Sequence, residues 1–126
     1  GWDWVSLQLD DGHELMVAQI RGDAGALRSF GSLVAPDGAT TPLDPAAIGL
    51  EPLDTWRSSR SGVVYPSGWR LSVPAAGGEL ELRPYLADQE LPLSILYWEG
   101  AVRAAGTLGG RTVGGNGYVE LTGYGP

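Results

Sequence analysis

The sequence contains no cysteine and no lysine, and its only histidine is His13. The lack of cysteine excludes disulfides and thiolate chemistry. One histidine without cysteine also argues against a metal site, since metal ions are held by clusters of such ligands. The cations are scattered arginines and the net charge is −7, so the clustered basic surface that nucleic acid requires is missing. We expect no metal and no nucleic-acid partner.

Several other motifs are missing. Apolar runs fall far short of the ~20 residues that a membrane-spanning helix needs. No Gly-x-Ser-x-Gly elbow is present, which argues against a Ser-His-Asp hydrolase. The glycines at 109–110 and 114–117 do not follow a βαβ pattern, so they predict no nucleotide site and we expect no cofactor. No signal peptide is recognisable and residue 1 is Gly1, which favours a mature form or a domain excised from a longer protein.

The composition of the chain favours one all-β domain. Its 126 residues, 43% of them hydrophobic, fit a single domain spanning 1–126. With 20 glycines and 9 prolines, turn signals recur so often that short strands are favoured over helices. The segments predicted as strands are 2–9, 14–21, 32–35, 40–43, 50–58, 69–73, 79–85, 95–108 and 117–124.

Turn residues join these segments in sequential order. Residues 10–13 predict a hairpin turn, and Asp44 followed by Pro45 predicts one capped helical turn. Sequential strands with short connections predict an antiparallel meander. About eight or nine such strands would close into an up-and-down β-barrel of the lipocalin or calycin type. A β-sandwich is the main alternative.

Alternation along the strands separates two faces. Trp69, Leu71 and Val73 share one face, as a half-buried strand requires. The first strand instead places Asp3 with apolar residues, and Trp2 and Trp4 on the opposite face. The last two strands mix aromatic and acidic side chains on one face, namely Tyr97, Glu99, Tyr118, Glu120 and Tyr124. Such a mixture suits a ligand-lined lumen, although the same face could be the barrel exterior.

Three parts of the chain resemble one family. The first is the N-terminal segment Gly-Trp-Asp-Trp-Val-Ser-Leu-Gln-Leu-Asp-Asp-Gly at 1–12, followed by Glu-Leu-Met at 14–16. The second consists of the middle segments 61–66 and 88–91, and the third is the C-terminal part of the chain. This C-terminal part contains Tyr-Trp-Glu-Gly-Ala-Val at 97–102 and Gly-Tyr-Val-Glu-Leu-Thr-Gly-Tyr at 117–124. Together they resemble the C-terminal barrel of the AttH-like/carotenoid-hydratase family of lipocalin-like proteins.

The resemblance implies more than a fold. Family members typically carry two calycin-like barrels, and the resemblance covers the second. It therefore implies that an N-terminal barrel is a missing partner; a homodimer is the other arrangement we expect. The family's catalogue name, "predicted secreted hydrolase", implies a secreted or periplasmic bacterial location. The hydratase members imply an alkene-hydrating activity.

Two carboxylates are candidate catalytic acids for such chemistry. An acid kept neutral by an apolar pocket can protonate an alkene, and nearby aromatic faces can stabilise the cation. Asp3 lies between two tryptophans in sequence, but a regular strand points it away from them, and an ion pair with arginine is the alternative. Glu99 and Glu120 should lie on neighbouring strands, where a salt-bridge network with Arg103 and Arg111 is the alternative to a carboxylate pair.

Three functions remain. The first is a lipocalin-like domain that binds a hydrophobic, elongated small molecule of the polyene or isoprenoid kind. The second is a hydratase or isomerase/cyclase enzyme using Asp3 or Glu99. The third is a structural barrel that docks a partner domain or a second copy. The residues expected to contact the ligand are Trp2, Trp4, Trp56, Tyr65, Trp69, Tyr97, Trp98, Tyr118 and Glu120.

Overall fold

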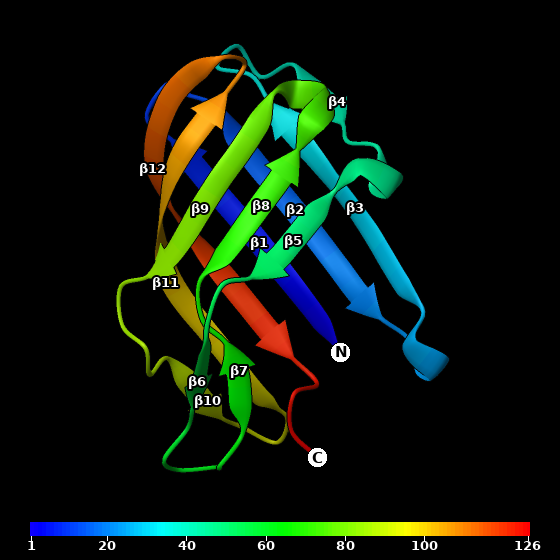
Figure 1. Ribbon diagram of the computed structural model, residues 1–126, viewed down its shortest axis with the longest axis vertical. Coiled ribbons are helices and arrows are strands. Elements are labelled where there is room, and N and C mark those ends of the chain that lie inside the picture. Colours follow the sequence, from blue (N-terminus) through cyan, green and yellow to red (C-terminus); the bar gives the residue numbers. More distant parts are fainter.

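Twelve β-strands and three short 3₁₀ helices make up the computed structural model, which describes residues 1–126 (Figure 1). No helix has the length and apolar character needed to cross a membrane. The strands are β1 (Trp2–Leu9), β2 (Glu14–Arg21), β3 (Leu27–Val34), β4 (Thr40–Pro42), β5 (Gly49–Pro52), β6 (Thr55–Arg57), β7 (Val64–Pro66), β8 (Trp69–Val73), β9 (Gly78–Pro84), β10 (Glu90–Pro92), β11 (Leu96–Leu108) and β12 (Arg111–Thr122). The helices are η1 (Asp23–Gly25), η2 (Pro45–Ala47) and η3 (Pro74–Ala76).

The main sheet has ten antiparallel strands and curls into a half-barrel. Its order is β4-β3-β2-β1-β12-β11-β9-β8-β5, with β10 also paired to β11. The hairpin β6-β7 forms a separate two-stranded sheet. The predicted lipocalin-like all-β fold is therefore confirmed. The end strands β4 and β5 do not pair with each other, and each ends in a proline, Pro42 or Pro52, which lacks the N–H that sheet pairing uses.

Tight turns set the register of the long hairpins. Gly109 and Gly110 connect β11 to β12 with φ of 58° and 77°, the left-handed pair that a two-residue hairpin turn requires. The turn between β1 and β2 places Gly12 at φ 90°. Asp44 caps η2 by accepting a hydrogen bond from Ala46 N at 3.0 Å, as its sequence predicts.

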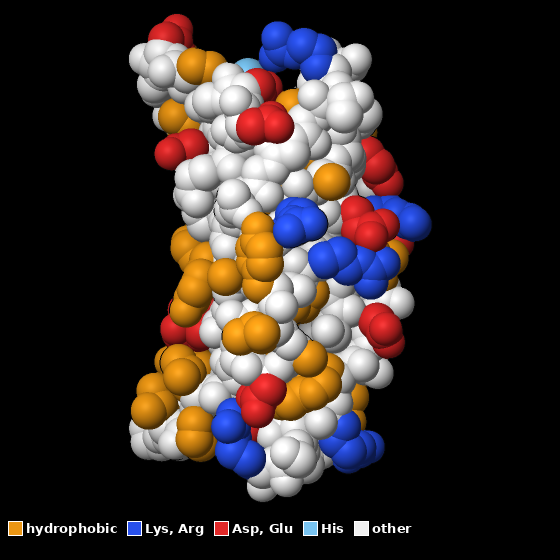
Figure 2. Space-filling view, turned by 90° about the vertical axis from the view of Figure 1, so that its left-hand side faces the viewer, with side chains coloured by type: hydrophobic (Ala, Val, Ile, Leu, Met, Phe, Trp, Pro, Cys, Tyr) orange, Lys and Arg blue, Asp and Glu red, His pale blue; other side chains and the backbone are white.

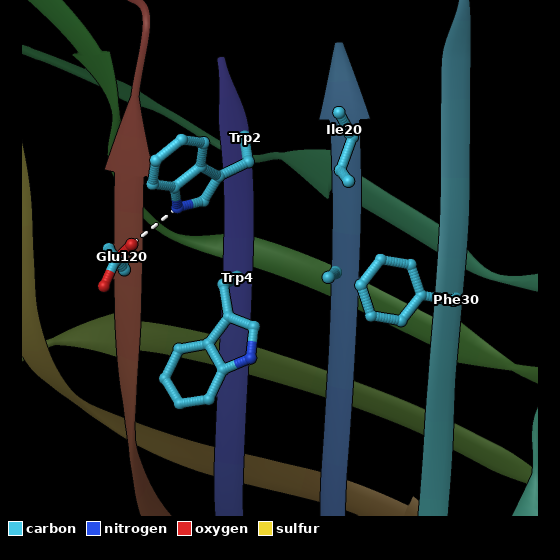
Figure 3. Close-up of a pocket in the computed structure, with 6 residues that line it drawn as sticks. Trp2, Trp4, Ile20, Phe30 and Glu120 are labelled. Atoms are coloured by element: carbon cyan, nitrogen blue, oxygen red, sulfur yellow. Dashed lines mark hydrogen bonds between the residues drawn. The ribbon is translucent and has the colours of Figure 1, made fainter.

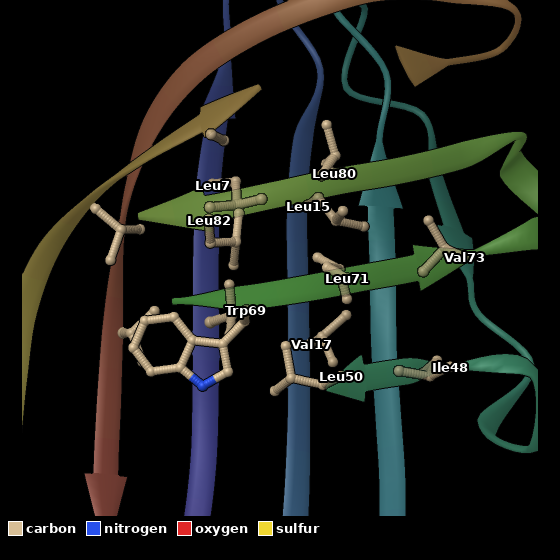
Figure 4. Close-up of a cluster of buried hydrophobic side chains, with 14 of the residues drawn as sticks. Leu7, Leu15, Val17, Ile48, Leu50, Trp69, Leu71, Val73, Leu80 and Leu82 are labelled. Carbon is tan, nitrogen blue, oxygen red and sulfur yellow. The ribbon is translucent and has the colours of Figure 1, made fainter. Parts of the chain in front are cut away.

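The inner face of the half-barrel is packed with apolar side chains (Figure 4). A cluster of 22 buried residues comes from both sides of the curl, including Leu7 and Val17 from one side and Leu71 and Leu82 from the other. Burying each such side chain contributes about 1.5–3 kcal/mol of stability. The interior is thus a solid core, and the hollow that a lumen-bound ligand would need is occupied by the protein itself.

Hydrogen bonds to one buried carboxylate connect the small hairpin β6-β7 to the main sheet. Glu90 of β10 accepts hydrogen bonds from Ser58 Oγ at 2.6 Å, Ser61 Oγ at 2.5 Å and Tyr65 Oη at 3.0 Å. Burial favours a higher pKa for Glu90, but these hydroxyls and Arg60 outweigh it and lower the pKa. Burial and the same carboxylate raise the pKa of Tyr65 to about 12. Glu90 therefore stays ionised and holds the hairpin in place.

Candidate functional site

The outer face of β12, β1, β2 and β3 carries a continuous row of side chains. Trp4 pairs with Glu120 on one side and with Ala18 on the other, and Ala18 pairs with Phe30. Since residues directly opposite each other point to the same face, these four side chains all face outward. Trp2 and its partner Ile20 follow on the same face, one pair further along.

These side chains surround an open pocket of about 310 Å³ (Figure 3). Its lining consists of Trp2, Trp4, Ala18, Ile20, Phe30 and Glu120. Ala18 is 4% exposed, whereas Phe30 is 46% exposed, so the small alanine forms the floor and the aromatic rings form the walls. An apolar pocket with a single polar group is typical of sites for small organic ligands.

Exposed apolar side chains continue beyond the pocket. Tyr118, which lies opposite Ser6 on the same outer face, also remains exposed. In Figure 2, hydrophobic side chains gather along the left edge and in the lower half of one side of the molecule. Contiguous apolar surface in soluble proteins is often found at binding or docking sites.

The polar end of the pocket is organised around Glu120. Trp2 Nε1 donates a hydrogen bond to Glu120 Oε1 at 2.5 Å. The Trp2 ring also meets Tyr97 edge-on, with ring centroids 6.2 Å apart. The indole is thereby fixed between a carboxylate and a tyrosine, which orients it over the pocket.

Glu120 lies directly opposite a second carboxylate, Glu99 of β11. Burial and the neighbouring Glu120 raise the pKa of Glu99. Tyr118 Oη donates to Glu99 Oε2 at 3.5 Å, and burial and Glu99 raise the pKa of Tyr118. Glu99 therefore faces a like charge, which disfavours its ionised form and agrees with the direction of its pKa shift.

No arginine neutralises this pair. Arg103 lies over the ring of Tyr85 at 5.3 Å, and Arg111 is 3.5 Å from Asp11. The alternative of a salt-bridge network with these two arginines is therefore wrong. The site combines a carboxylate pair, aromatic walls and an apolar floor.

The AttH-like family profile matches residues 1–124. The chain belongs to the AttH-like family. Among solved structures, an AttH protein of Nitrosomonas europaea is 40% identical with a TM-score of 0.85, over 98% of this chain and 39% of that chain. Kievitone hydratase of Nectria haematococca is 22% identical with a TM-score of 0.83, also over 98% of this chain and 39% of that chain. No curated protein matches the sequence.

The AttH-like half-barrel holds Asp3 in a different environment from the outer pocket. Its carboxylate faces inward, is 7% exposed and forms an ion pair with Arg21. Tyr124 Oη donates to Asp3 Oδ2 at 2.8 Å, and the Arg21 guanidinium lies 4.3 Å from the Tyr124 ring centroid. The ion-paired alternative for Asp3 is therefore the one observed. The arginine and the hydroxyl both contact the carboxylate of Asp3, which lies on the other side of the sheet from the outer pocket.

The aromatic residues predicted to contact a ligand divide between the outer face of the main sheet and the interior of the protein. Trp2, Trp4, Tyr97 and Tyr118 lie on the outer face with Glu120. Tyr65, Trp69 and Trp98 lie in the packed core, each at most 1% exposed, and Trp56 stacks on Tyr65 at 6.1 Å. The core residues offer no free surface to a guest, so only the outer-face residues can line a site in this structure.

Sequence reasoning missed three lining residues, Ala18, Ile20 and Phe30. Their apolar character resembles that of core residues, and the alternation of β2 and β3 is weak. The turn at 10–13 contains the signal that could have found them. Once that turn fixes the register, Trp2 must face Ile20 and Trp4 must face Ala18.

Proposed function

We propose that this domain binds an elongated, apolar small molecule of the polyene or isoprenoid kind on the outer face of its sheet. One observation carries the proposal: the aromatic-walled pocket of about 310 Å³ lies on the exterior, above the alanine floor. Indole and phenyl faces supply a large contact area, and Glu120 supplies one polar group for orientation.

The open side of the pocket leaves room for a covering partner. The chain spans 39% of the length of each of the two solved relatives. A second domain or a second copy placed against the exposed Ile20 and Phe30 would close the site and shield the ligand from water. Docking and ligand binding are therefore compatible roles for one surface.

Filling the pocket tests this proposal. Retinol titrated into the protein should quench tryptophan fluorescence, because Trp2 and Trp4 form the walls. The substitution Ala18→Phe places a ring on the pocket floor and should weaken retinol binding at least about tenfold, as expected when ~1.4 kcal/mol of contact is lost. Ala105→Phe, on the exposed outer side of β11, is the matched control and should bind as the parent does.

Retinol binding that is unchanged in Ala18→Phe would contradict the proposed site. Both substitutions enlarge alanines that face outward, so we expect the sheet to remain intact. Circular dichroism of the two variants checks this. A flat titration of the parent protein would contradict ligand binding itself.

The carboxylate pair supports a second candidate function, acid-catalysed addition of water to an alkene. Glu99 in its protonated form would transfer its proton to one alkene carbon, and the π electrons would form the new C–H bond. Water would then bond to the cationic carbon and return a proton to Glu99, while the Trp4 ring stabilises the cation. The raised pKa of Glu99 and its pairing with Glu120 support this role.

Substitution of the acid separates catalysis from binding. Glu99→Gln should abolish the gain of one water by a bound polyene, measured by mass spectrometry, while retinol still quenches fluorescence. Asp3→Asn is the comparison, because Asp3 lies inside and is already paired. Hydration that survives in Glu99→Gln would remove this residue from the mechanism.

A further inference from the structure

Arg28 stands at the far end of the same outer face. It lies on β3 directly opposite Ile20, and Ile20 lies opposite Trp2. A second pocket, of about 430 Å³, is lined by Ile20, Gly22, Asp23, Ala26 and Arg28. Because Ile20 lines both pockets, the two are adjacent on this face, with Glu120 in the first and Arg28 in the second.

Arg28 is also the one arginine whose guanidinium has no partner within the protein. The other seven hydrogen-bond to the chain, pair with a carboxylate or lie over an aromatic ring. A guanidinium carries five N–H donors in a planar fork that fits a carboxylate. An uncommitted arginine beside an apolar pocket has the chemistry to hold the anionic end of a ligand.

We infer that the ligand of this face is an amphiphile, with an apolar chain over Trp2 and Ile20 and a carboxylate at Arg28. This inference rests on the proposed function and specifies its ligand. From β12 to β3 the face spans three strand spacings, or about 14 Å. That length fits a carboxylate with a chain of about a dozen carbons.

Charge along this face fixes the direction of the ligand. Glu99 and Glu120 would repel an anion at their end, so the carboxylate lies at the Arg28 end. Asp23 also lines the second pocket and opposes an anion there. Asp23 belongs to η1 and not to a strand. It is therefore not part of the cross-strand row of Trp2, Ile20 and Arg28.

Three probes with the same chain test the inference: dodecanoate, dodecanol and dodecylamine, each below the concentration at which it aggregates. The parent protein should bind dodecanoate most tightly. Arg28→Ala should weaken dodecanoate about fivefold, the size expected for an exposed charge pair, and leave dodecanol unchanged. Asp23→Asn should tighten dodecanoate. Arg70→Ala, which removes an exposed arginine on β8, is the matched control and should change neither probe.

The outcomes separate the inference from the function on which it rests. Equal affinities for dodecanoate and dodecanol, with no effect of Arg28→Ala, would overturn the inference that the ligand is anionic. If Ala18→Phe then abolished binding of both probes, the proposed apolar site would still stand. Tightest binding of dodecylamine would overturn the inference in favour of a cationic ligand. Absence of binding for retinol and for all three probes would overturn both proposals.

Discussion

At the residue level, two carboxylates in this domain have opposite environments. Glu99 faces Glu120 and has a raised pKa, whereas Glu90 is surrounded by hydroxyls and has a lowered pKa. Their effects on stability must therefore change with pH in opposite directions.

Removing charge from Glu99 should stabilise the fold at neutral pH. Like charges directly opposite each other across two strands destabilise a sheet by about 0.2–1 kcal/mol, so we expect Glu99→Gln to raise the free energy of unfolding by that amount. A carboxylate with a raised pKa in the folded state penalises folding above that pKa, and the penalty disappears as pH falls through it. Urea unfolding at pH 7 and pH 4 should show a gain at pH 7 only. An equal gain at both pH values would contradict the carboxylate pair.

Removing the charge of Glu90 should instead destabilise the fold at neutral pH. Glu90→Gln leaves buried hydroxyls without their charged acceptor, and we expect a loss of about 1–3 kcal/mol in the free energy of unfolding. Because the folded state lowers the pKa of Glu90, its contribution is present above the unfolded-state pKa and is lost as pH falls through the folded-state value. The variant should therefore differ from the parent at pH 7 and approach it in strong acid. A variant as stable as the parent at pH 7 would show that the hairpin is held by other contacts.

At the level of strands and turns, glycine decides how closely β12 approaches β1. The sequence predicted a turn up to residue 116 and a strand from Gly117, but β12 begins at Arg111 and so includes Gly115 as well as Gly117. A Cβ at Gly117 would collide with the Ser6 carbonyl oxygen. Glycine is disfavoured in strands unless a neighbouring backbone lies very close, which explains why composition alone indicated a loop here.

The substitution Gly117→Ala tests this packing. It should destabilise the domain by about 1–3 kcal/mol, because the added methyl group has no space. Gly22→Ala is the control. Its φ is −86° and the nearest atom to an added Cβ is 3.6 Å away, so it should be nearly neutral. Thermal melts of the two variants compare them directly, and equal melting temperatures would contradict the close approach.

The predicted elements were most accurate where alternation and turn residues agreed. The strands 2–9, 14–21 and 69–73 match β1, β2 and β8. The predicted strand 50–58 is divided into β5 and β6, because Pro52 interrupts the pairing. The short β7 and β10 were missed because each has three residues and ends in a proline.

At the level of the whole molecule, the fold could be predicted from the sequence but the location of the site could not. Period-two alternation gives two faces and does not state which one is inside. The decision comes from packing of distant strands, where Trp69 meets Trp98 with ring centroids 5.9 Å apart and fills the interior. Trp2 and Trp4 therefore lie on the outer face. The proposed ligand site lies there too, and not in the lumen that the sequence suggested.

The indole N–H resonances of the five tryptophans report which face of the sheet binds the ligand. In a ¹⁵N-labelled sample titrated with retinol, we expect the signals of Trp2 and Trp4 to shift while those of Trp69 and Trp98 stay in place. Shifts of Trp69 and Trp98, with Trp2 and Trp4 unaffected, would place the ligand in the interior and contradict an outer-face site.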